Sequence, residues 1–342
     1  MSRRRGPRSD GAGGAAADQV RAALQLGAAV VLVVGGTGGT GSIVVRRLLG
    51  MHPAPAVRVI TRSANRVAIA ARFGTDAITV CQGSIGDRAA AEVAVTGATH
   101  VVYALGPKQS ASRIASSVFG SATTEECVES YVTGLRNVLD VGRASVLRQV
   151  VLVSADHVES PWGLSAVANL LSGDSNLNHL RQERMLRAEA AARPDFGYLV
   201  VRPGRLTDAP AGSPVEEVAH VSVPARAAAV PTGTVSRAGV AETLVQGLAD
   251  GRSGVPQRLT VCVSSVGAAT PGYRWSPALL AALPDDTEAG AAGALPAEAT
   301  DVWHTRAKRV TLGVVLLVVA GAVAGVATGV AAGVAAIAAI VR

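Results

Sequence analysis

Short aliphatic runs alternate with stretches of helical spacing along most of this chain, and this alternation is the feature that most restricts its fold. We predict strands at residues 29–34, 56–61, 77–80, 100–105, 149–154, 198–201 and 258–263. We expect helices between them, at 41–50, 64–73, 87–95, 124–143, 178–192 and 237–249. Continuous Val, Ile and Leu runs are typical of strands covered on both faces, and alternation with helices is typical of parallel sheets. The sequence therefore predicts an α/β fold with a doubly wound parallel sheet.

The chain divides by composition into four parts. Residues 1–27 are rich in Arg, Gly and Ala and lack the apolar core of a secretory signal, so we expect a disordered arm, with an organelle transit peptide as the alternative. Residues 28–265 contain every predicted strand and form the expected folded domain. Residues 266–305 are rich in Pro, Ala and Gly, which predicts a flexible linker.

Residues 310–341 form the fourth part and contain no charged side chain. Because about 20 apolar residues span a bilayer as a helix, we expect a single C-terminal transmembrane helix, or tail anchor. An Ala- and Gly-rich tail, or a soluble helix packed on the domain, is the alternative. Basic residues precede this segment at Arg306, Lys308 and Arg309, which places the folded domain on the cytosolic or stromal side of an unidentified membrane.

Glycines recur at every fourth position of the apolar segment, at Gly321, Gly325, Gly329 and Gly333. Residues with this spacing share one face of a helix, and a face of small residues lets another helix approach closely. The segment therefore predicts a membrane-helix partner, with glycines that simply face lipid as the alternative.

Charge and cysteine content exclude several classes of function. The net charge is +7, with basic residues concentrated in the N-terminal arm and just before residue 310. No basic stripe is interleaved with aromatic residues, so we expect no nucleic-acid binding. The cysteines are Cys81, Cys127 and Cys262, which form no Cys-x-x-Cys pair and predict reduced thiols. The histidines show no ligand spacing, so we expect no metal site.

A glycine-rich loop, "GGTGGTG" at residues 35–41, lies between the first predicted strand and the first predicted helix. Gly36, Gly38 and Gly41 match G-x-G-x-x-G, and Gly35, Gly38 and Gly41 equally match G-x-x-G-x-x-G. Such glycines allow a tight turn, a close approach of the backbone to a pyrophosphate, and close packing of the helix on the sheet. The helix N-terminus offers unpaired N–H groups to the phosphates. The loop predicts a dinucleotide site of the Rossmann type, and a ligand-free turn is the alternative.

The end of the second predicted strand bears on which dinucleotide is bound. An Asp or Glu there binds the ribose hydroxyls of NAD, whereas an Arg accommodates the 2′-phosphate of NADP. This chain reads Thr61-Arg62-Ser63, without an acid, and Arg66 follows shortly after. We therefore expect NADP(H) to be preferred over NAD(H), unless Arg62 is merely a solvated loop residue.

Several motifs in order resemble the atypical short-chain dehydrogenase/reductases, the NAD(P)-binding group that includes the NmrA-like proteins. "VLVVGGTGGTGSIVVRRLL" resembles the first βα unit of that family, and "VRVITRSANR" resembles its NADP-type second strand. The later segments that resemble the family are "QGSIGD", "VVYALG", "GLRNVLDVGRASVLRQVVLVSA", "YLVVRPGRLTDAP" and "TVSRAGVAETLVQGL". The resemblance covers roughly residues 28–265. "QGSIGD" differs from the family pattern by carrying Ser84 in place of the first acid, while Asp87 is kept.

Loop chemistry and this resemblance together imply a set of cofactor-binding residues. These are Gly35, Gly36, Thr37, Gly38, Gly39, Thr40, Gly41, Arg62, Ser63, Ser84, Asp87, Ala104, Leu105, Gly106, Ser154, Arg184, Pro203 and Gly204. The family resemblance places the Arg-Pro-Gly strand end near the nicotinamide.

The usual catalytic residues of the superfamily are missing. Its reductases use Tyr-x-x-x-Lys, in which the tyrosine is the general acid. The tyrosines here are Tyr103, Tyr131, Tyr198 and Tyr273, and none is followed by Lys four residues later. Counting back from Arg202-Pro203-Gly204 places the pair at Leu180 and Arg184. Substitute acids or bases are Asp156, His157 and Tyr131, with a solvated polar loop and core packing as the alternatives.

Two functions compete on this evidence. The first is a membrane-tethered NADP(H)-binding protein that acts as an oxidoreductase or isomerase on a small or lipid-like substrate. The second is a non-catalytic NADP(H)-sensing or assembly protein that acts on a membrane partner. The missing Tyr and Lys favour the second, and the cofactor motifs suit both.

Overall fold

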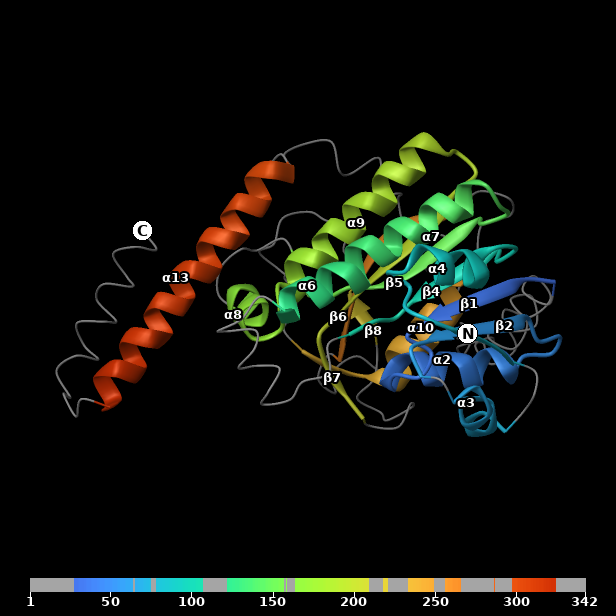
Figure 1. Ribbon diagram of the computed structural model, residues 1–342, viewed down its shortest axis with the longest axis horizontal. Helices are drawn as coiled ribbons and strands as arrows, with labels where there is room; N and C mark the ends of the chain where they lie inside the picture. The colour runs from blue at the N-terminus through green and yellow to red at the C-terminus, as the bar shows by residue number, and fades with distance from the viewer. Residues whose placement is uncertain are drawn as a thin grey trace, which may run out of the picture.

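The computed structural model describes residues 28–63, 65–74, 78–106, 122–156, 158, 164–208, 218–220, 233–248, 256–265, 286 and 297–323. A twisted eight-stranded sheet runs through the centre (Figure 1). Its strand order is β3 (Ile78–Gln82), β2 (Ala56–Thr61), β1 (Val30–Val34), β4 (His100–Tyr103), β5 (Gln149–Val153), β6 (Gly197–Pro203), β10 (Arg258–Ser265) and β8 (Val218–His220). All neighbouring pairs are parallel except β10–β8.

The strand order reverses between β1 and β4, which lie next to each other in the sheet. Strands β2 and β3 extend from β1 to one side, and β5, β6 and β10 extend from β4 to the other. In doubly wound sheets the ligand binds outside the carboxyl ends of the strands at this reversal. The predicted Rossmann-type fold is therefore confirmed. The glycine loop directly follows β1, one of the two strands at the reversal.

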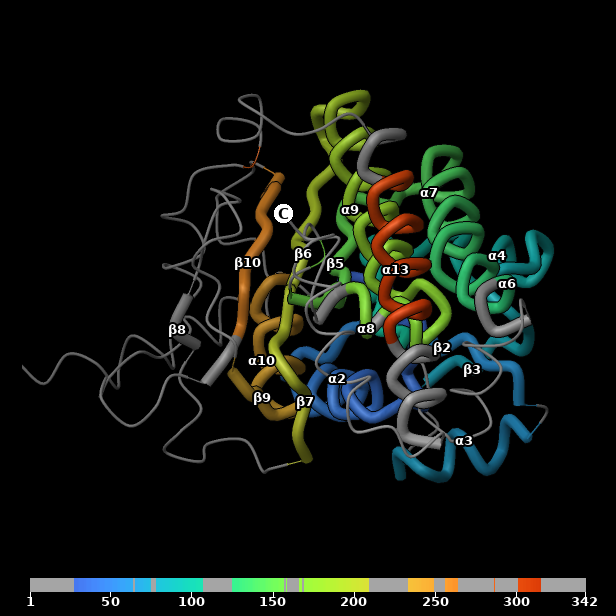
Figure 2. The backbone as a smooth tube through the Cα atoms, turned by 90° about the vertical axis from the view of Figure 1, so that its left-hand side faces the viewer, coloured from blue at the N-terminus to red at the C-terminus, as the bar shows by residue number. Residues whose placement is uncertain are grey.

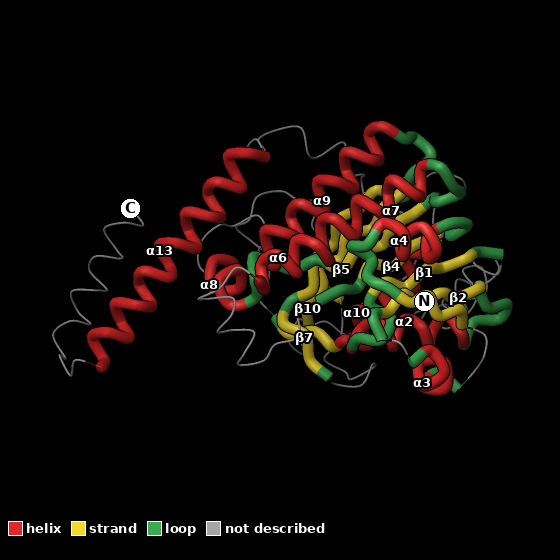
Figure 3. Tube along the Cα trace, in the orientation of Figure 1, coloured by secondary structure: helices red, strands yellow, loops and turns green. Residues whose placement is uncertain are grey.

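Helices cover both faces of the sheet (Figure 3). One face packs against α2 (Gly39–Leu49), α3 (Arg66–Arg72) and α10 (Arg237–Leu248). The other packs against α4 (Arg88–Val95), α7 (Gly134–Arg143) and α9 (Ser175–Ala192). Because successive side chains of a strand point to opposite faces, Val31 and Val33 enter the first core whereas Leu32 and Val34 enter the second. This two-sided burial explains why the strands are continuously apolar.

Six further elements complete the described part of the fold. The short strands β7 (Arg205–Thr207) and β9 (Thr234–Ser236) pair in parallel. The segment from α6 (Ala122–Val128) to α7 is continuously helical, but its middle part, η1 (Glu129–Thr133), is a π-helical turn. Such turns often occur at functional sites. The remaining helices are α8 (Leu164–Leu171) and α13 (Ala297–Val323).

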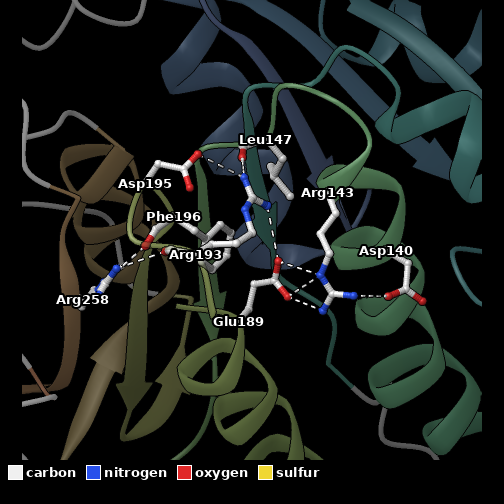
Figure 4. A network of polar contacts seen from close by, with 8 residues as sticks. All are labelled: Asp140, Arg143, Leu147, Glu189, Arg193, Asp195, Phe196 and Arg258. Atoms are coloured by element: carbon white, nitrogen blue, oxygen red, sulfur yellow. Dashed lines mark hydrogen bonds and ion pairs between the residues drawn. The ribbon is translucent and has the colours of Figure 1, made fainter. Parts of the chain in front are cut away.

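A network of arginines holds the C-terminal end of α9 (Figure 4). The carboxylate of Glu189, which is almost fully buried, accepts hydrogen bonds from Arg143 of α7 at 2.9 Å and from Arg193 at 3.4 Å. Arg193 also donates to the carbonyl of Leu147, and Arg258 of β10 donates to the carbonyl of Arg193. These contacts tie α7, α9 and β10 together at the end of the sheet opposite the glycine loop.

The first half of α13 is docked on the folded domain, beside α8 and α9 (Figure 2). Asp301 accepts from Arg181 at 3.0 Å and from Arg184 at 3.1 Å, and both arginines belong to α9. Buried His304 is 3.2 Å from the side-chain amide of Asn169 in α8, and Lys308 pairs with Asp174 at 2.8 Å. These contacts correct the predicted linker, because residues 297–305 are helical and packed rather than flexible.

Asp286 departs from the predicted linker in the same way. Its carboxylate is buried and accepts hydrogen bonds from Tyr198 at 2.9 Å and from the hydroxyl of Thr260 at 2.6 Å. Residues 266–285 and 287–296, and the predicted N-terminal arm 1–27, lie outside the described residues.

Across the part of the chain that is described, no helix is sufficiently long and apolar to cross a membrane. The transmembrane helix predicted at 310–341 is therefore not supported. Residues 310–323 form the end of α13, and the remainder of the predicted span, with Gly325, Gly329 and Gly333, lies outside the described residues.

Candidate functional site

Steric contacts explain the glycines of the loop between β1 and α2. Gly35 has a φ of 85°, in the region that favours glycine, and a Cβ on it would collide with the carbonyl oxygen of Ala104. A Cβ on Gly41 would collide with the carbonyl of Gly35. The turn is closed by a hydrogen bond of 2.8 Å from the N–H of Gly38 to that same carbonyl. The loop therefore needs glycine for backbone packing on β4 and on α2.

The N-terminus of α2 lies at the end of this loop and has no side-chain cap. Gly38 is the N-cap residue, and the first turn carries no acidic side chain. Uncapped N–H groups and the helix dipole favour an anion at such a position. Arg237, at the start of α10, lies against Gly39, with its Cδ 2.8 Å from where a Cβ would stand. The guanidinium of Arg237 pairs with Asp208 at 2.5 Å, and it adds positive charge beside the helix end.

A cavity of about 360 Å³ lies along the carboxyl edge of β1, β2, β3 and β4. It extends from the end of β2, past the glycine loop, to the end of β4 and the α6–η1 helix. The lining residues are Val34, Gly35, Thr37, Gly38, Ile60, Thr61, Arg62, Ser63, Gly83, Ser84, Ile85, Ala104, Leu105, Gly106, Glu126, Cys127, Ser130 and Tyr131.

Many of the residues predicted from the sequence meet at this cavity. Those that line it are Gly35, Thr37, Gly38, Arg62, Ser63, Ser84, Ala104, Leu105, Gly106 and Tyr131. Gly36, Gly39, Thr40 and Gly41 belong to the same turn and support it without lining the cavity. Asp87 caps α4 instead, where its carboxylate accepts the N–H of Ala89 at 2.8 Å.

Other predicted residues lie away from the cavity that the described residues form. Arg184 points toward α13 and pairs with Asp301. Pro203 is buried at the end of β6, and the N–H of Gly204 donates to the carbonyl of Val263 at 2.9 Å. The N–H of Asp156 donates to the carbonyl of Pro203 at 3.2 Å. His157 is outside the described residues.

Ser154, at the end of β5, is held by a buried ion cluster. Its hydroxyl donates to Glu183 of α9 at 2.7 Å, and Arg202 of β6 donates to the same carboxylate at 2.6 and 2.9 Å. Arg187 completes the contacts of Glu183 at 3.1 Å. Burial raises the pKa of Glu183, but the charge and hydrogen bonds of Arg202, followed by Arg187 and Ser154, outweigh it and lower the pKa to about 2. Glu183 is therefore an anion, and Ser154 serves as its donor.

This cluster corrects the predicted face of α9. Counting along the sequence placed Leu180 and Arg184 at the positions of the missing Tyr and Lys. In the structure Glu183 is the α9 residue that contacts Ser154, and His179, one turn earlier, lies on the same inward face. Of these four residues, Glu183 is the one that contacts Ser154 after β5.

Tyr131 is the predicted acid–base candidate that the structure places at the cavity wall. It belongs to the η1 turn, and its ring meets the edge of the His179 ring with centroids 4.8 Å apart. Gln182 joins the two residues, because its amide donates to the carbonyl of Tyr131 at 2.9 Å and its oxygen is 3.1 Å from Nδ1 of His179. Burial lowers the pKa of His179 to about 4, so the imidazole is neutral at physiological pH.

The α6–η1 helix also contributes two acidic side chains, Glu126 in the cavity lining and Glu129 bound to a lining residue, and the sequence analysis missed both. Glu126 pairs with Arg62 at 2.9 Å, and Glu129 accepts from the hydroxyl of Ser84 at 3.1 Å. No local motif marks these residues, since they reach the site only because the helix crosses the ends of β2 and β3. The thiol of Cys127, on the same helix, donates to the carbonyl of Ser172.

The combination of reversal point, glycine turn and uncapped helix fits a dinucleotide, and comparison with known proteins agrees. Residues 35–251 match the model of a family described as NAD(P)H-binding. The chain belongs to this NAD(P)H-binding family. This family agrees with the NAD(P)-binding resemblance found in the sequence. No curated protein shows significant similarity to the chain.

Several solved structures are similar to this family member at low sequence identity. An alcohol dehydrogenase from the archaeon Thermococcus sibiricus, complexed with 5-hydroxy-NADP, is 16% identical with a TM-score of 0.50, covering 72% of this chain and 99% of that one. A short-chain dehydrogenase/reductase from Veillonella parvula is 16% identical with a TM-score of 0.49, covering 72% and 97%. Pen from Bacillus thuringiensis is 18% identical with a TM-score of 0.48, and the match spans 64% of each chain.

Proposed function

We propose that this protein binds NADP(H) in preference to NAD(H) and acts as an oxidoreductase-like protein of the atypical short-chain dehydrogenase/reductase type. The observation that carries the preference is the position of Arg62. It follows directly after β2, lines the cavity, and has no Asp or Glu beside it in the Thr61-Arg62-Ser63 stretch. A guanidinium binds phosphate through charge-assisted hydrogen bonds, so Arg62 is suited to the 2′-phosphate that distinguishes NADP(H).

The glycine turn and the other residues of the cavity fit the other parts of the dinucleotide. The turn at Gly35 and Gly38, with the uncapped N-terminus of α2, would hold the pyrophosphate. Thr37 and Ser84 line the cavity and offer hydroxyl groups along it. The bound nicotinamide would supply a hydride for transfer to a substrate. The substrate of this reaction is proposed only as small or lipid-like.

Proton transfer in such a reaction would need a group other than the missing Tyr-x-x-x-Lys pair. Ser154 donates to Glu183, and neither Leu180 nor Arg184 lines the cavity. Tyr131 does line it, and a tyrosine hydroxyl can serve as a general acid. We therefore assign the role of proton donor to Tyr131, with His179 as the residue that positions its ring.

A non-catalytic, NADP(H)-sensing or assembly role is the second candidate. The observation that favours it is the buried Ser154–Glu183–Arg202 cluster, in which the hydroxyl of Ser154 is bound to a carboxylate of the core. In this role dinucleotide binding would control contact with a partner. A membrane partner reached through residues 310–341 belongs to this proposal, and fractionation of the full-length protein with and without that segment tests it.

A comparison of four dinucleotides tests the proposed preference. NADPH, NADP⁺, NADH and NAD⁺ would be titrated into the full-length protein and into Arg62→Ala. Arg88→Ala, which removes an equal charge from the exposed surface of α4, is the matched control. Weaker binding of NADPH and NADP⁺ in Arg62→Ala alone, with NADH unchanged, is expected. Equal loss for all four dinucleotides, or no loss, would contradict the assigned role of Arg62.

A further inference from the structure

Arg62 and Glu126 form an ion pair in the lining of the cavity. Arg62 comes from the loop after β2, and Glu126 comes from α6, far away in the sequence. Nη1 of Arg62 is 2.9 Å from Oε1 of Glu126, and both residues line the cavity. The side chain of Arg62 is 72% exposed, whereas that of Glu126 is 38% exposed. The acidic partner is thus the more enclosed member of the pair.

Two contacts just after Glu126 fix the position of its helix. Glu129, one turn further along, accepts the hydroxyl of Ser84 in the loop after β3. The hydroxyl of Tyr103, at the end of β4, donates to the carbonyl of Ser130. The helix is therefore attached to the ends of β3 and β4, and Glu126 is carried by a fixed element rather than by a mobile loop.

This arrangement has a consequence for the bound dinucleotide. A 2′-phosphate held by Arg62 would lie near the carboxylate that now contacts the same guanidinium. Like charges a few ångströms apart repel, most strongly in a partly enclosed cleft. A 2′-hydroxyl carries no charge, so the carboxylate does not repel it and can accept its hydrogen bond. Glu126 therefore penalises NADP(H) and spares NAD(H).

We propose that Glu126 determines cofactor specificity, because its carboxylate competes for Arg62 and opposes binding of a 2′-phosphate. The proposal rests on the proposed function, in which a dinucleotide occupies this cavity with its adenosine ribose at Arg62. Arg62 favours the phosphate and Glu126 limits that preference, so the ratio of NADPH to NADH affinity is set by the pair rather than by the arginine alone.

The test compares dissociation constants for NADPH and NADH in full-length wild type, Glu126→Gln and Glu125→Gln. Glutamine keeps the size of the side chain and removes its charge. Glu125 is the neighbouring, exposed acid on α6, so its variant makes the same change in net charge. Glu126→Gln should raise the affinity for NADPH relative to NADH by about three- to tenfold, an effect expected of one charge contact. Glu125→Gln should change that ratio by less than about twofold.

Each result decides the proposal. An unchanged ratio in Glu126→Gln, with both dinucleotides still bound, would overturn the role of Glu126 and leave the proposed function intact. An equal rise in Glu125→Gln would assign the effect to general charge and would also overturn it. Absence of binding of either dinucleotide to any variant would overturn the proposed function together with this inference. A melting temperature for each variant, measured without ligand, identifies a loss caused by unfolding.

Discussion

The hydroxyl of Ser154 donates a hydrogen bond of 2.7 Å to the buried carboxylate of Glu183, which also receives the guanidinium of Arg202. This serine directly follows β5 and is one of the cofactor-binding residues that the sequence resemblance implies. Here the hydroxyl donates its hydrogen bond to a carboxylate that is buried in the core. The contact therefore joins the sheet to α9 and distinguishes this site from one built on Ser, Tyr and Lys.

Neutralising Glu183 should destabilise the fold strongly. Glu183→Gln leaves Arg202 buried beside a neutral partner, and breaking a buried pair from one side costs about 3–5 kcal/mol. We expect the free energy of unfolding to fall by this amount in denaturant titrations monitored by circular dichroism. Glu92→Gln, which removes one member of an exposed ion pair on α4, should change it by less than about 0.5 kcal/mol. Similar losses in the two variants would contradict the structural role of Glu183.

Acid should destabilise the protein in two steps. The folded-state pKa of His179 is about 4, below the ordinary value of 6.5, so the unfolded chain binds more protons between these values and stability falls as the pH drops through that window. The pKa of Glu183, lowered from 4.5 to about 2, has the same sign and extends the loss below pH 4.5. The shift of His179 alone corresponds to a loss on the order of 3 kcal/mol.

Melting temperatures measured at intervals from pH 7 to pH 4 test this account. His179→Gln removes the titrating group but keeps a polar side chain near Gln182. Its melting temperature should fall less steeply over this range than that of the wild type. His100 also has a pKa lowered to about 4 by burial, so some slope should remain. Parallel curves for wild type and His179→Gln would show that His179 does not contribute.

Substitution within the glycine turn should affect both folding and binding. A Cβ at Gly41 meets the Gly35 carbonyl, and an alanine at Gly35 adds a positive φ to its collision with Ala104. Either substitution should lower stability by about 1–3 kcal/mol and should abolish dinucleotide binding, because the turn must open to admit the methyl group. Gly50→Ala, at the other end of α2, meets atoms no closer than 3.5 Å and is the control. Binding retained in Gly41→Ala would contradict a site built on this turn.

Tyr131 should matter for turnover rather than for cofactor binding. Tyr131→Phe removes the hydroxyl and keeps the ring that packs against His179. For carbonyl reduction followed by NADPH absorbance, we expect kcat to fall by about a hundredfold or more with the NADPH dissociation constant unchanged. An active Tyr131→Phe variant would show that another group donates the proton. A wild type that reduces no carbonyl compound would favour the non-catalytic alternative.

The docking of α13 depends on Asp301, which contacts Arg181 and Arg184 of α9. Asp301→Asn should weaken both contacts by about 1 kcal/mol in total, because the side chains are partly exposed. We expect faster amide hydrogen exchange in α13 and an unchanged exchange rate in the sheet. Glu92→Gln again serves as the control. Unchanged exchange in α13 would indicate that Ala307 and His304, rather than the ion pairs, hold the helix.

The sequence predicted the parts of the molecule that depend on local pattern. The continuous apolar runs identified the parallel strands, because a strand buried on both faces has no polar face to maintain. The glycine turn and Arg62 were recognisable because each lies at a fixed place relative to a strand end. The Rossmann-type fold and the NAD(P)H-binding family could therefore be reached before any coordinates.

The parts that depend on how distant helices pack were missed or misplaced. Glu126 and His179 reach the site only through the course of α6 and α9, and neither lies in a motif. Counting back from Arg202-Pro203-Gly204 pointed to Arg184, whereas the residue before it, Glu183, contacts Ser154 and Arg184 pairs with Asp301. Asp286 and Asp301 lie in a segment whose composition suggested a linker, although Asp286 binds buried Tyr198 and Thr260 and Asp301 pairs with arginines of α9.

The most direct test of the account is a titration of the full-length wild type with NADPH, followed by calorimetry and by the melting temperature. We predict saturable binding with one site per chain, and a stabilisation of about 2.7 kcal/mol when NADPH exceeds its dissociation constant a hundredfold. A protein that binds neither NADPH nor NADH, while remaining folded, would contradict the central claim that this cleft is a dinucleotide site.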